Sequence, residues 1–300
     1  MTEPSELRMS AVMPAPPAAV HAALTDAAAL RVWLAEHAEV TLPERYEFWG
    51  RYTPDGAEPH QRVLHADERT LRLAWTIDGV ETTSELTLAE GEGDDAGGTL
   101  LTLTQTHLPS FEEVISDTAG PRGALQTFWS LAITNLADYL AGRELTPKCD
   151  YTSPELRSAV VIDAEPEAVF DSLTQPDQYQ RWFLAKVDIE PWVGGRFAMG
   201  GFELDPGGSK FVEFEPGRKA SLLFADGVTS SWELEGSGGK TRLTFVQSGF
   251  DPDNPPYAGW AGWLGGLSEL RRFLEQPNWR TIWRTIEVPG VPAEMFALNG

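Results

Sequence analysis

The sequence predicts an α+β protein built from two tandem domains, each an antiparallel sheet followed by a long helix. The first reason is an internal repeat, because the stretch 6–34 returns as 155–183 at a constant offset. The second is an alternation of apolar and polar residues in the middle of each half, which is typical of half-buried strands. The third is an amphipathic stretch near the end of each half. A repeat of this length indicates a duplicated domain rather than a solenoid of small units.

Each half is expected to open with a strand and two short helices. The strand covers Leu7–Met13 in the first half and Leu156–Ile162 in the second, where β-branched residues are frequent. Pro17 and Pro166 follow these strands closely. Proline is well tolerated in the first turn of a helix, because its missing N–H has no partner to lose there. A second, shorter helical segment then ends at a tryptophan in both halves.

The middle of each half is expected to form antiparallel strands. Asp-Gly pairs occur at 78–79 and at 226–227, between two strand-like runs. Asp-Gly is a strong signal for a tight hairpin, because both central residues of such a turn need a positive φ. The strand after each turn aligns Glu85 with Glu233.

Each half is expected to close with a long helix, Leu125–Leu140 in the first and Trp260–Leu274 in the second, preceded by a strand that aligns Gln105 with Gln247. The order of these elements predicts a division of the chain into four segments. They are a first domain at 1–143, a linker at 144–154, a second domain at 155–277, and a C-terminal tail at 278–300 that packs on the body.

Composition and charge exclude several classes of function. The net charge is −22, and nucleic-acid binders need lysine and arginine to displace counterions from phosphates. Apolar runs fall well short of the ~18 residues that a membrane span needs, and the N-terminus has no secretory pattern. Cys149 is the single cysteine, which indicates a reducing compartment. We therefore expect a cytoplasmic protein with no nucleic-acid partner and no membrane span.

Three short motifs resemble one known family. They are Pro-Glu-Ala-Val-Phe at 166–170, Trp-Phe at 182–183 and Val-Gly-Gly-Arg-Phe at 193–197. Together with the order of elements, they resemble the helix-grip, or START-like, proteins of the SRPBCC group, in the branch named after the activator of Hsp90 ATPase. The resemblance implies a curved sheet wrapped around the long C-terminal helix, with a cavity that often holds an apolar ligand. The first half lacks the glycine pair, so the second half fits the family better.

The residues that could carry chemistry form no catalytic or metal-binding pattern. All five histidines lie in the first half, with spacings that match no zinc signature. No Gly-x-Ser-x-Gly motif is present, and Cys149 falls in the expected linker. His107, at the end of a predicted inner strand, is the one candidate acid or base. We predict no catalytic residue, no metal and no cofactor.

Aromatic residues supply the candidates for a ligand-binding site. Pockets usually combine apolar walls with a few polar groups, although filling the core is the commoner role of large aromatic side chains. The candidates in the first half are Tyr46, Phe48, Trp75, His107 and Trp129; those in the second half are Phe197, Met199, Phe224, Trp232, Phe245 and Trp263.

Three functions remain open on the sequence alone. The first is non-catalytic binding of a small hydrophobic molecule in one or both cavities, as a carrier or sensor. The second, which rests on the resemblance, is a protein-interaction module that contacts an Hsp90-type chaperone. The third is a polyketide cyclase-like enzyme that uses His107. The better motif match of 158–275 predicts that the second copy keeps the function if the first has become purely structural.

Overall fold

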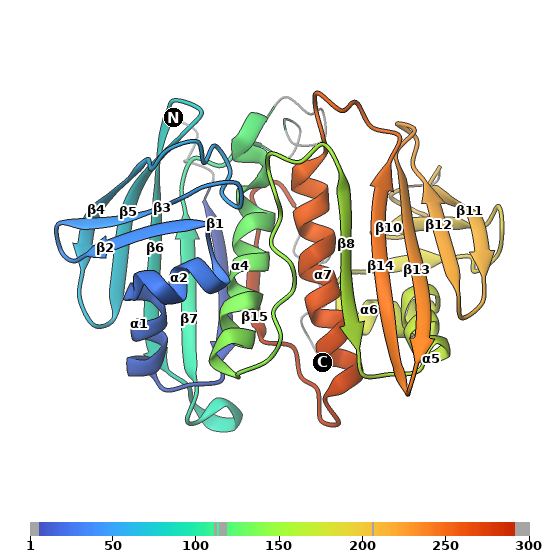
Figure 1. The fold of residues 1–300 in the computed structure, drawn as a ribbon, viewed down its shortest axis with the longest axis horizontal. Helices are drawn as coiled ribbons and strands as arrows, with labels where there is room; N and C mark the ends of the chain where they lie inside the picture. The colour runs from blue at the N-terminus through green and yellow to red at the C-terminus, as the bar shows by residue number, and fades with distance from the viewer. Residues whose placement is uncertain (1–5, 111–112, 114–118, 206, 292–300) are drawn as a thin grey trace. The chain divides into compact units, whose positions relative to one another are not determined.

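The computed structural model describes residues 6–110, 113, 119–205 and 207–291. These residues form two compact units (Figure 1). The first unit contains the described residues of Met1–Thr152 and Ile282–Ala293, together with Tyr257–Gly265. The second contains the described residues of Ser153–Pro256 together with Gly266–Thr281. We call these units the first and the second domain.

The first domain opens as the repeat predicts. It begins with β1 (Leu7–Met13), α1 (Pro17–Thr25) and α2 (Ala27–Trp33), so the predicted strand is confirmed at its bounds. The proline occupies the first turn of α1, where no backbone donor is lost. The Asp26 carboxylate accepts a hydrogen bond of 2.8 Å from the Ala29 N–H and so caps α2.

Antiparallel strands follow in two sheets. The larger sheet has the order β15-β1-β7-β6-β5-β4, and β2 pairs with β3. The turn between β5 and β6 holds the first Asp-Gly pair, and both of its residues have positive φ. The remaining elements of this domain besides its long helix are β2 (His37–Thr41), β3 (Arg45–Trp49), β4 (Gln61–Ala66), β5 (Thr70–Ile77), β6 (Val80–Glu90), η1 (Gly93–Asp95), β7 (Thr99–Gln105), η2 (Gly120–Ala124) and β15 (Trp283–Glu287).

The helix α4 (Leu125–Leu140) lies on the inner face of this sheet (Figure 1). Its bounds are those predicted. Trp129 of α4 donates a hydrogen bond of 3.1 Å from Nε1 to the side chain of Gln105 on β7. The Phe128 ring lies 5.6 Å from the ring of Trp75 on β5. The core of the first domain therefore sits between α4 and the sheet.

The strand β15 comes from the C-terminal tail and completes the first sheet. It pairs antiparallel with β1, with Arg8 opposite Glu287. Arg284 of β15 forms an ion pair of 2.6 Å with Asp95. The outer edge of β1 is thereby covered, which removes a site where another chain could add a strand.

The second domain repeats this order of elements in one seven-stranded antiparallel sheet, β8-β14-β13-β12-β11-β10-β9. The predicted strand at its start is confirmed at its bounds. The elements are β8 (Leu156–Ile162), α5 (Pro166–Thr174), α6 (Pro176–Phe183), β9 (Val187–Ile189), β10 (Arg196–Met199), β11 (Ser209–Glu215), β12 (Lys219–Leu223), β13 (Thr229–Ser237), β14 (Lys240–Ser248) and α7 (Tyr257–Glu275), of which Tyr257–Gly265 group with the first domain. The protein is thus a tandem of two helix-grip domains, as predicted.

Strand register defines which residues of the two sheets are equivalent. Leu7 lies opposite Gln105 and its repeat partner Leu156 lies opposite Gln247, so the two glutamines are equivalent. A detail shared by the two copies supports this pairing, since a threonine at the start of each of these strands donates to a backbone carbonyl at the same place in both.

The neighbouring strands extend the equivalence. Ser84 lies opposite Gln105, and Ser230 lies opposite Gln247. These two serines are therefore equivalent. The chain from Leu222 to Ser230 is three residues shorter than the chain from Leu73 to Ser84. The sequence match of Glu85 with Glu233 therefore differs from the structural match, Glu85 with Ser231, by two residues.

Candidate functional site

Four aromatic side chains fill the interior of the first domain. Phe48, Trp75, Phe128 and Trp129 come from β3, β5 and α4, and each is buried. Their ring centroids lie 5.0 Å apart for Phe48 and Trp75, and 5.1 Å apart for Phe128 and Trp129. Edge-to-face contacts of this kind add to the gain from burial. We call these four residues the aromatic cluster.

A buried glutamine ties the aromatic cluster to the sheet. The Gln105 Oε1 atom accepts hydrogen bonds from Trp129 Nε1 and from the Ser84 hydroxyl. Its Nε2 atom donates to Thr82 Oγ1 at 2.8 Å. Both ends of the amide are therefore paired, which is the requirement for a stable polar group inside a core.

The other two first-domain candidates are not members of the aromatic cluster. The Tyr46 hydroxyl donates to the Leu24 carbonyl at 2.9 Å, and burial raises the pKa of this phenol. His107 is exposed, beyond the end of β7, with Nδ1 3.0 Å from Thr106 Oγ1. The structure thus brings Phe48, Trp75 and Trp129 together, places Tyr46 beside them, and leaves His107 outside.

A cavity of about 10 Å³ lies between α2, α4 and the segment 148–151. This volume holds about one water molecule, which is too little for an organic ligand. It is lined by Trp33, Leu34, Tyr52, Phe128, Leu131, Ala132, Asn135, Lys148, Cys149 and Tyr151.

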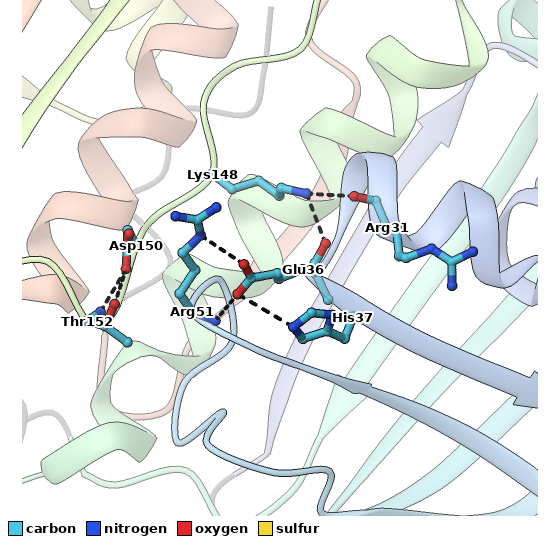
Figure 2. Close-up of polar contacts among 8 residues, drawn as sticks. Arg31, Glu36, His37, Arg51, Lys148, Asp150 and Thr152 are labelled. Atoms are coloured by element: carbon cyan, nitrogen blue, oxygen red, sulfur yellow. Dashed lines mark hydrogen bonds and ion pairs between the residues drawn. The ribbon is translucent and has the colours of Figure 1, made fainter.

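The segment beside this cavity is anchored to α2 by Lys148 (Figure 2). Its Nζ atom donates to the carbonyls of Arg31, Val32 and Ala35 at 2.9–3.0 Å. Arg31 and Val32 belong to the last turn of α2 and Ala35 follows it; backbone acceptors at a helix C-terminus lack partners within the helix. Burial lowers the pKa of Lys148 to about 8, although the nearby Glu36 acts in the opposite direction. The hydrogen bonds of Lys148 therefore have a structural role, because they hold the segment 148–151 against α2.

The Cys149 thiol next to it is expected to be unreactive in the native protein. It is buried, and that burial raises its pKa, so little thiolate forms at neutral pH. Reaction with Ellman's reagent should be at least about a hundredfold slower in buffer than in denaturant, because the segment must open first. Equal rates in the two conditions would contradict this burial.

The second domain has different residues at the positions of the aromatic cluster. Leu73 and Leu222 lie opposite the two equivalent serines. Phe224 and Trp75, each two residues further along, are therefore equivalent. Trp75 is fully buried, whereas Phe224 is partly exposed.

A second position of the aromatic cluster also holds a different residue in the second domain. Phe48 lies opposite Ala38 on β2, and Met199 lies opposite Val187 on β9, so Met199 takes the place of Phe48. Met199 is 38% exposed. The helix residue aligned with Phe128 is Gly262. Three of the four aromatic positions are thus changed in the second copy of the repeat.

Phe224 lines a surface hollow of about 330 Å³ in the second domain. Ligand pockets commonly have volumes of about 300–1,000 Å³. Phe224, the equivalent of the buried Trp75, thus borders an open hollow at the surface of the second domain. The other lining residues are Asp205, Gly207, Gly208, Ser209, Ala225 and Asp226.

The inner face of the second sheet continues from this hollow. Trp232 on β13 stacks on Phe245 on β14, with ring centroids 5.3 Å apart. Phe197 lies nearer the other edge, where its ring meets Tyr179 at 5.4 Å. Trp263 is buried in the part of α7 that groups with the first domain. Phe224, Trp232 and Phe245 thus share one sheet face.

One polar residue on this face was missed as a candidate. Gln247 is 6% exposed, and its Nε2 donates to Ser230 Oγ at 3.0 Å. Its Oε1 atom has no hydrogen-bond partner among the described residues. The sequence alignment with Gln105 could have pointed to this position, but only the structure shows that the two amides are bonded differently.

The glycine-rich turn between β9 and β10 is held by an ion pair. Arg196 Nη2 lies 2.9 Å from Glu190 Oε1, and the guanidinium lies 3.9 Å from the centre of the Phe202 ring. The hydrogen bonds from Arg196 lower the pKa of Glu190 to about 2. The arginine of this family motif therefore has a structural role.

Acid should weaken the second domain through this carboxylate. Its pKa in the folded protein is below its ordinary value of 4.5, so its stabilisation is complete above about pH 4.5 and is lost as the pH falls toward about 2. We expect Glu190→Gln to lose less stability than the wild type between about pH 5 and pH 3 in urea titrations. Glu215→Gln, which alters an exposed carboxyl, should follow the wild type. If Glu190→Gln also does so, the assignment is wrong.

Other kinds of site find no support in the described part of the chain. No described helix is long and apolar enough to cross a membrane. Within 6–110, 113, 119–205 and 207–291, no three His, Cys, Asp or Glu side chains are placed to hold a metal ion.

Comparison with known proteins gives a family match. The model of the family "activator of Hsp90 ATPase homolog 1-like protein" matches residues 14–141 and 163–275, one segment in each half. None of the curated proteins matches the chain.

Several solved structures are similar to parts of the chain. Protein MLL2253 from Mesorhizobium loti is 27% identical, over 41% of this chain and 99% of its own, with a TM-score of 0.34. The Aha1 dimer from Colwellia psychrerythraea is 21% identical, over 42% and 98%, with a TM-score of 0.37. DynU16, a putative protein of the dynemicin biosynthetic locus, is 18% identical, over 89% and 98%, with a TM-score of 0.37.

Proposed function

The chain belongs to the family of activator of Hsp90 ATPase homolog 1-like proteins, and we propose that it is a non-catalytic carrier or sensor of a small apolar molecule. The ligand binds on the inner face of the second sheet. The first domain serves as a closed structural partner in the same chain.

The hollow at Phe224 is the observation that carries this proposal. The equivalent position in the first domain is closed by Trp75 and its three aromatic neighbours. In the second domain Phe224 borders an open hollow of about 330 Å³, and the aromatic pair Trp232 and Phe245 adds apolar surface further along the same sheet face. Apolar walls beside a few polar groups are typical of small-molecule sites.

Native mass spectrometry of the purified chain, followed by tryptophan-quenching titrations with a panel of two-ring apolar molecules, tests the proposal. We expect a co-purified mass or saturable quenching at one molecule per chain. Phe224→Asp should abolish binding, because it places a charge on the apolar wall. Trp75→Phe, a conservative change in the first domain, is the matched control and should bind normally.

Three results would overturn the proposal. Saturation at two molecules per chain would show that the first domain is also open. Unchanged affinity in Phe224→Asp would place the ligand elsewhere, and the absence of saturable binding across the panel would exclude an apolar-ligand function of this kind.

Exposed apolar side chains favour a second candidate, contact with another protein. Trp192 and Val193 in the β9–β10 turn are 55% and 62% exposed, and the turn is held beside β11 by a hydrogen bond of 2.7 Å from Gly194 to Phe211. Grouped apolar residues on a surface can mark an interaction site. An Hsp90-type chaperone is the partner to test, in an ATPase assay with Trp192→Glu as the variant. If the wild type neither binds the chaperone nor stimulates its ATPase, this candidate is excluded.

A further inference from the structure

The two equivalent glutamines are bonded differently. In the first domain, Gln105 is paired at both ends of its amide, by Trp129 at the oxygen and by Thr82 at the nitrogen. In the second, Gln247 is paired through its nitrogen with Ser230, while its oxygen has no partner among the residues that the structure describes. A buried oxygen in this state costs free energy unless something else bonds to it.

Two neighbouring substitutions accompany this difference. Thr82 lies two residues before Ser84, and Val228 lies two residues before Ser230, so an apolar residue replaces the threonine. Met9, opposite Leu103 in the first domain, is replaced by Ser158, opposite Phe245. The Ser158 hydroxyl oxygen is also buried, with no hydrogen-bond partner in the described ranges.

The serine and the glutamine are close neighbours. Ser158 lies opposite Phe245, which is two residues before Gln247 on the same strand. Diagonal neighbours on one face of an antiparallel pair have Cα atoms about 7–8 Å apart, and their side chains can reach a common group between them. One group that both accepts and donates a hydrogen bond would satisfy both side chains.

We propose that the ligand of the second domain carries a hydroxyl group. This group donates a hydrogen bond to Gln247 Oε1 and accepts one from the Ser158 hydroxyl. The inference rests on the proposed function and adds the polar chemistry of the ligand. The first domain lacks such a site, because Gln105 is already paired and Met9 occupies the position of the serine.

The rest of the ligand extends toward the hollow. Gln247 lies on β14 and Phe224 follows β12, two strands away, and the register places both on the same face. Strand spacing and rise put these positions about 12 Å apart. A two-ring apolar body spans this distance, with Trp232 and Phe245 beside its hydroxyl end. The ligand class is therefore an alcohol or phenol with an extended apolar body.

Three matched probes test this inference by isothermal titration calorimetry on the full chain: 4-hydroxybiphenyl, 4-methoxybiphenyl and biphenyl. For the wild type we expect 4-hydroxybiphenyl to bind about tenfold more tightly than the other two, as one well-made hydrogen bond allows. Gln247→Leu should reduce this preference to less than about twofold, and Ser158→Met should reduce it partly. Ser248→Leu, on the opposite face of β14, is the control and should keep it. Circular dichroism verifies that each variant is folded.

The outcomes separate this inference from the proposed function. If all three probes bind the wild type equally, the hydroxyl assignment is wrong, and the apolar site stands. If 4-methoxybiphenyl binds most tightly, the amide presents its nitrogen to the ligand, which also overturns the assignment. A preference that survives in Gln247→Leu shows that a trapped water or another group satisfies the glutamine, and it overturns the assignment as well. Failure of all three probes counts against the proposed function itself.

Discussion

Replacing Trp75 by alanine is expected to lower the free energy of unfolding of the first domain by about 4 kcal/mol, because a fully buried tryptophan leaves a large cavity. Trp75 contacts Phe48, Phe128 and Trp129, with ring centroids 5.0 to 6.1 Å away. These neighbours come from β3 and α4, so the interior cannot collapse around the missing ring without moving both a strand and a helix.

Phe224→Ala is the matched experiment in the second domain. Phe224 is partly exposed and lines the hollow, so its removal should cost less than about 1 kcal/mol. Hydrogen exchange monitored by mass spectrometry measures both variants in the intact chain, since peptides from β5 and β12 report on each domain separately. Similar losses in the two variants would mean that the two interiors are equally packed, and would contradict an open second domain.

The second large effect is expected at the equivalent glutamines. Gln105→Leu leaves the buried Trp129 indole N–H and the Ser84 hydroxyl without their acceptor. Each unsatisfied buried group costs about 1–3 kcal/mol, so the first domain should lose about 3 kcal/mol. Gln247→Leu removes one hydrogen bond to Ser230 but also removes an unpaired buried oxygen, and should change stability by less than about 1 kcal/mol.

Peptides from β7 and β14 provide the readout by hydrogen exchange. The two substitutions are chemically identical and lie at equivalent positions, so the difference between them isolates the bonding of the amide. An equal loss in the two variants would show that Gln247 is already fully paired in the absence of ligand. It would remove the basis for a polar ligand contact.

Much of this fold could be predicted because its signals are local. The repeat indicated the strands that begin each domain, and both are confirmed at their predicted bounds. The Asp-Gly pair at 78–79 forms the tight hairpin that its chemistry requires. The strand β15 could not be placed, because its pairing with β1 joins residues that are far apart in the sequence.

The register of the strands was harder to predict than their positions in the sequence. The alignment of Glu85 with Glu233 pairs Ser84 with Trp232, whereas the strand pairing makes Ser230 the equivalent of Ser84. A shift of two residues keeps every side chain on the same face, so the alternation of apolar and polar residues cannot detect it. The length of the hairpin decides the match, and the sequence pattern does not report it.

The sequence indicated which types of residue lie on the inner elements. It did not indicate whether these residues fill a cavity or line an open one. Aromatic side chains were expected on the inner elements of both domains, and the structure brings Phe48, Trp75 and Trp129 together in the first. Whether such residues close a cavity or line an open one depends on the neighbours that reach them. Phe128 supplies the closing contact in the first domain, and no periodicity distinguishes it from an ordinary core residue.

A two-dimensional NMR titration of the isotope-labelled chain with 4-hydroxybiphenyl tests the central claim most directly. We predict saturable shifts for the backbone amides of Leu222, Val228 and Ser230, and for the side-chain amide of Gln247. The indole signals of Trp75 and Trp129 should stay unchanged, because the aromatic cluster excludes the ligand. Saturable shifts at those two indoles, with none around Gln247, would place the binding site in the first domain and contradict a ligand site in the second.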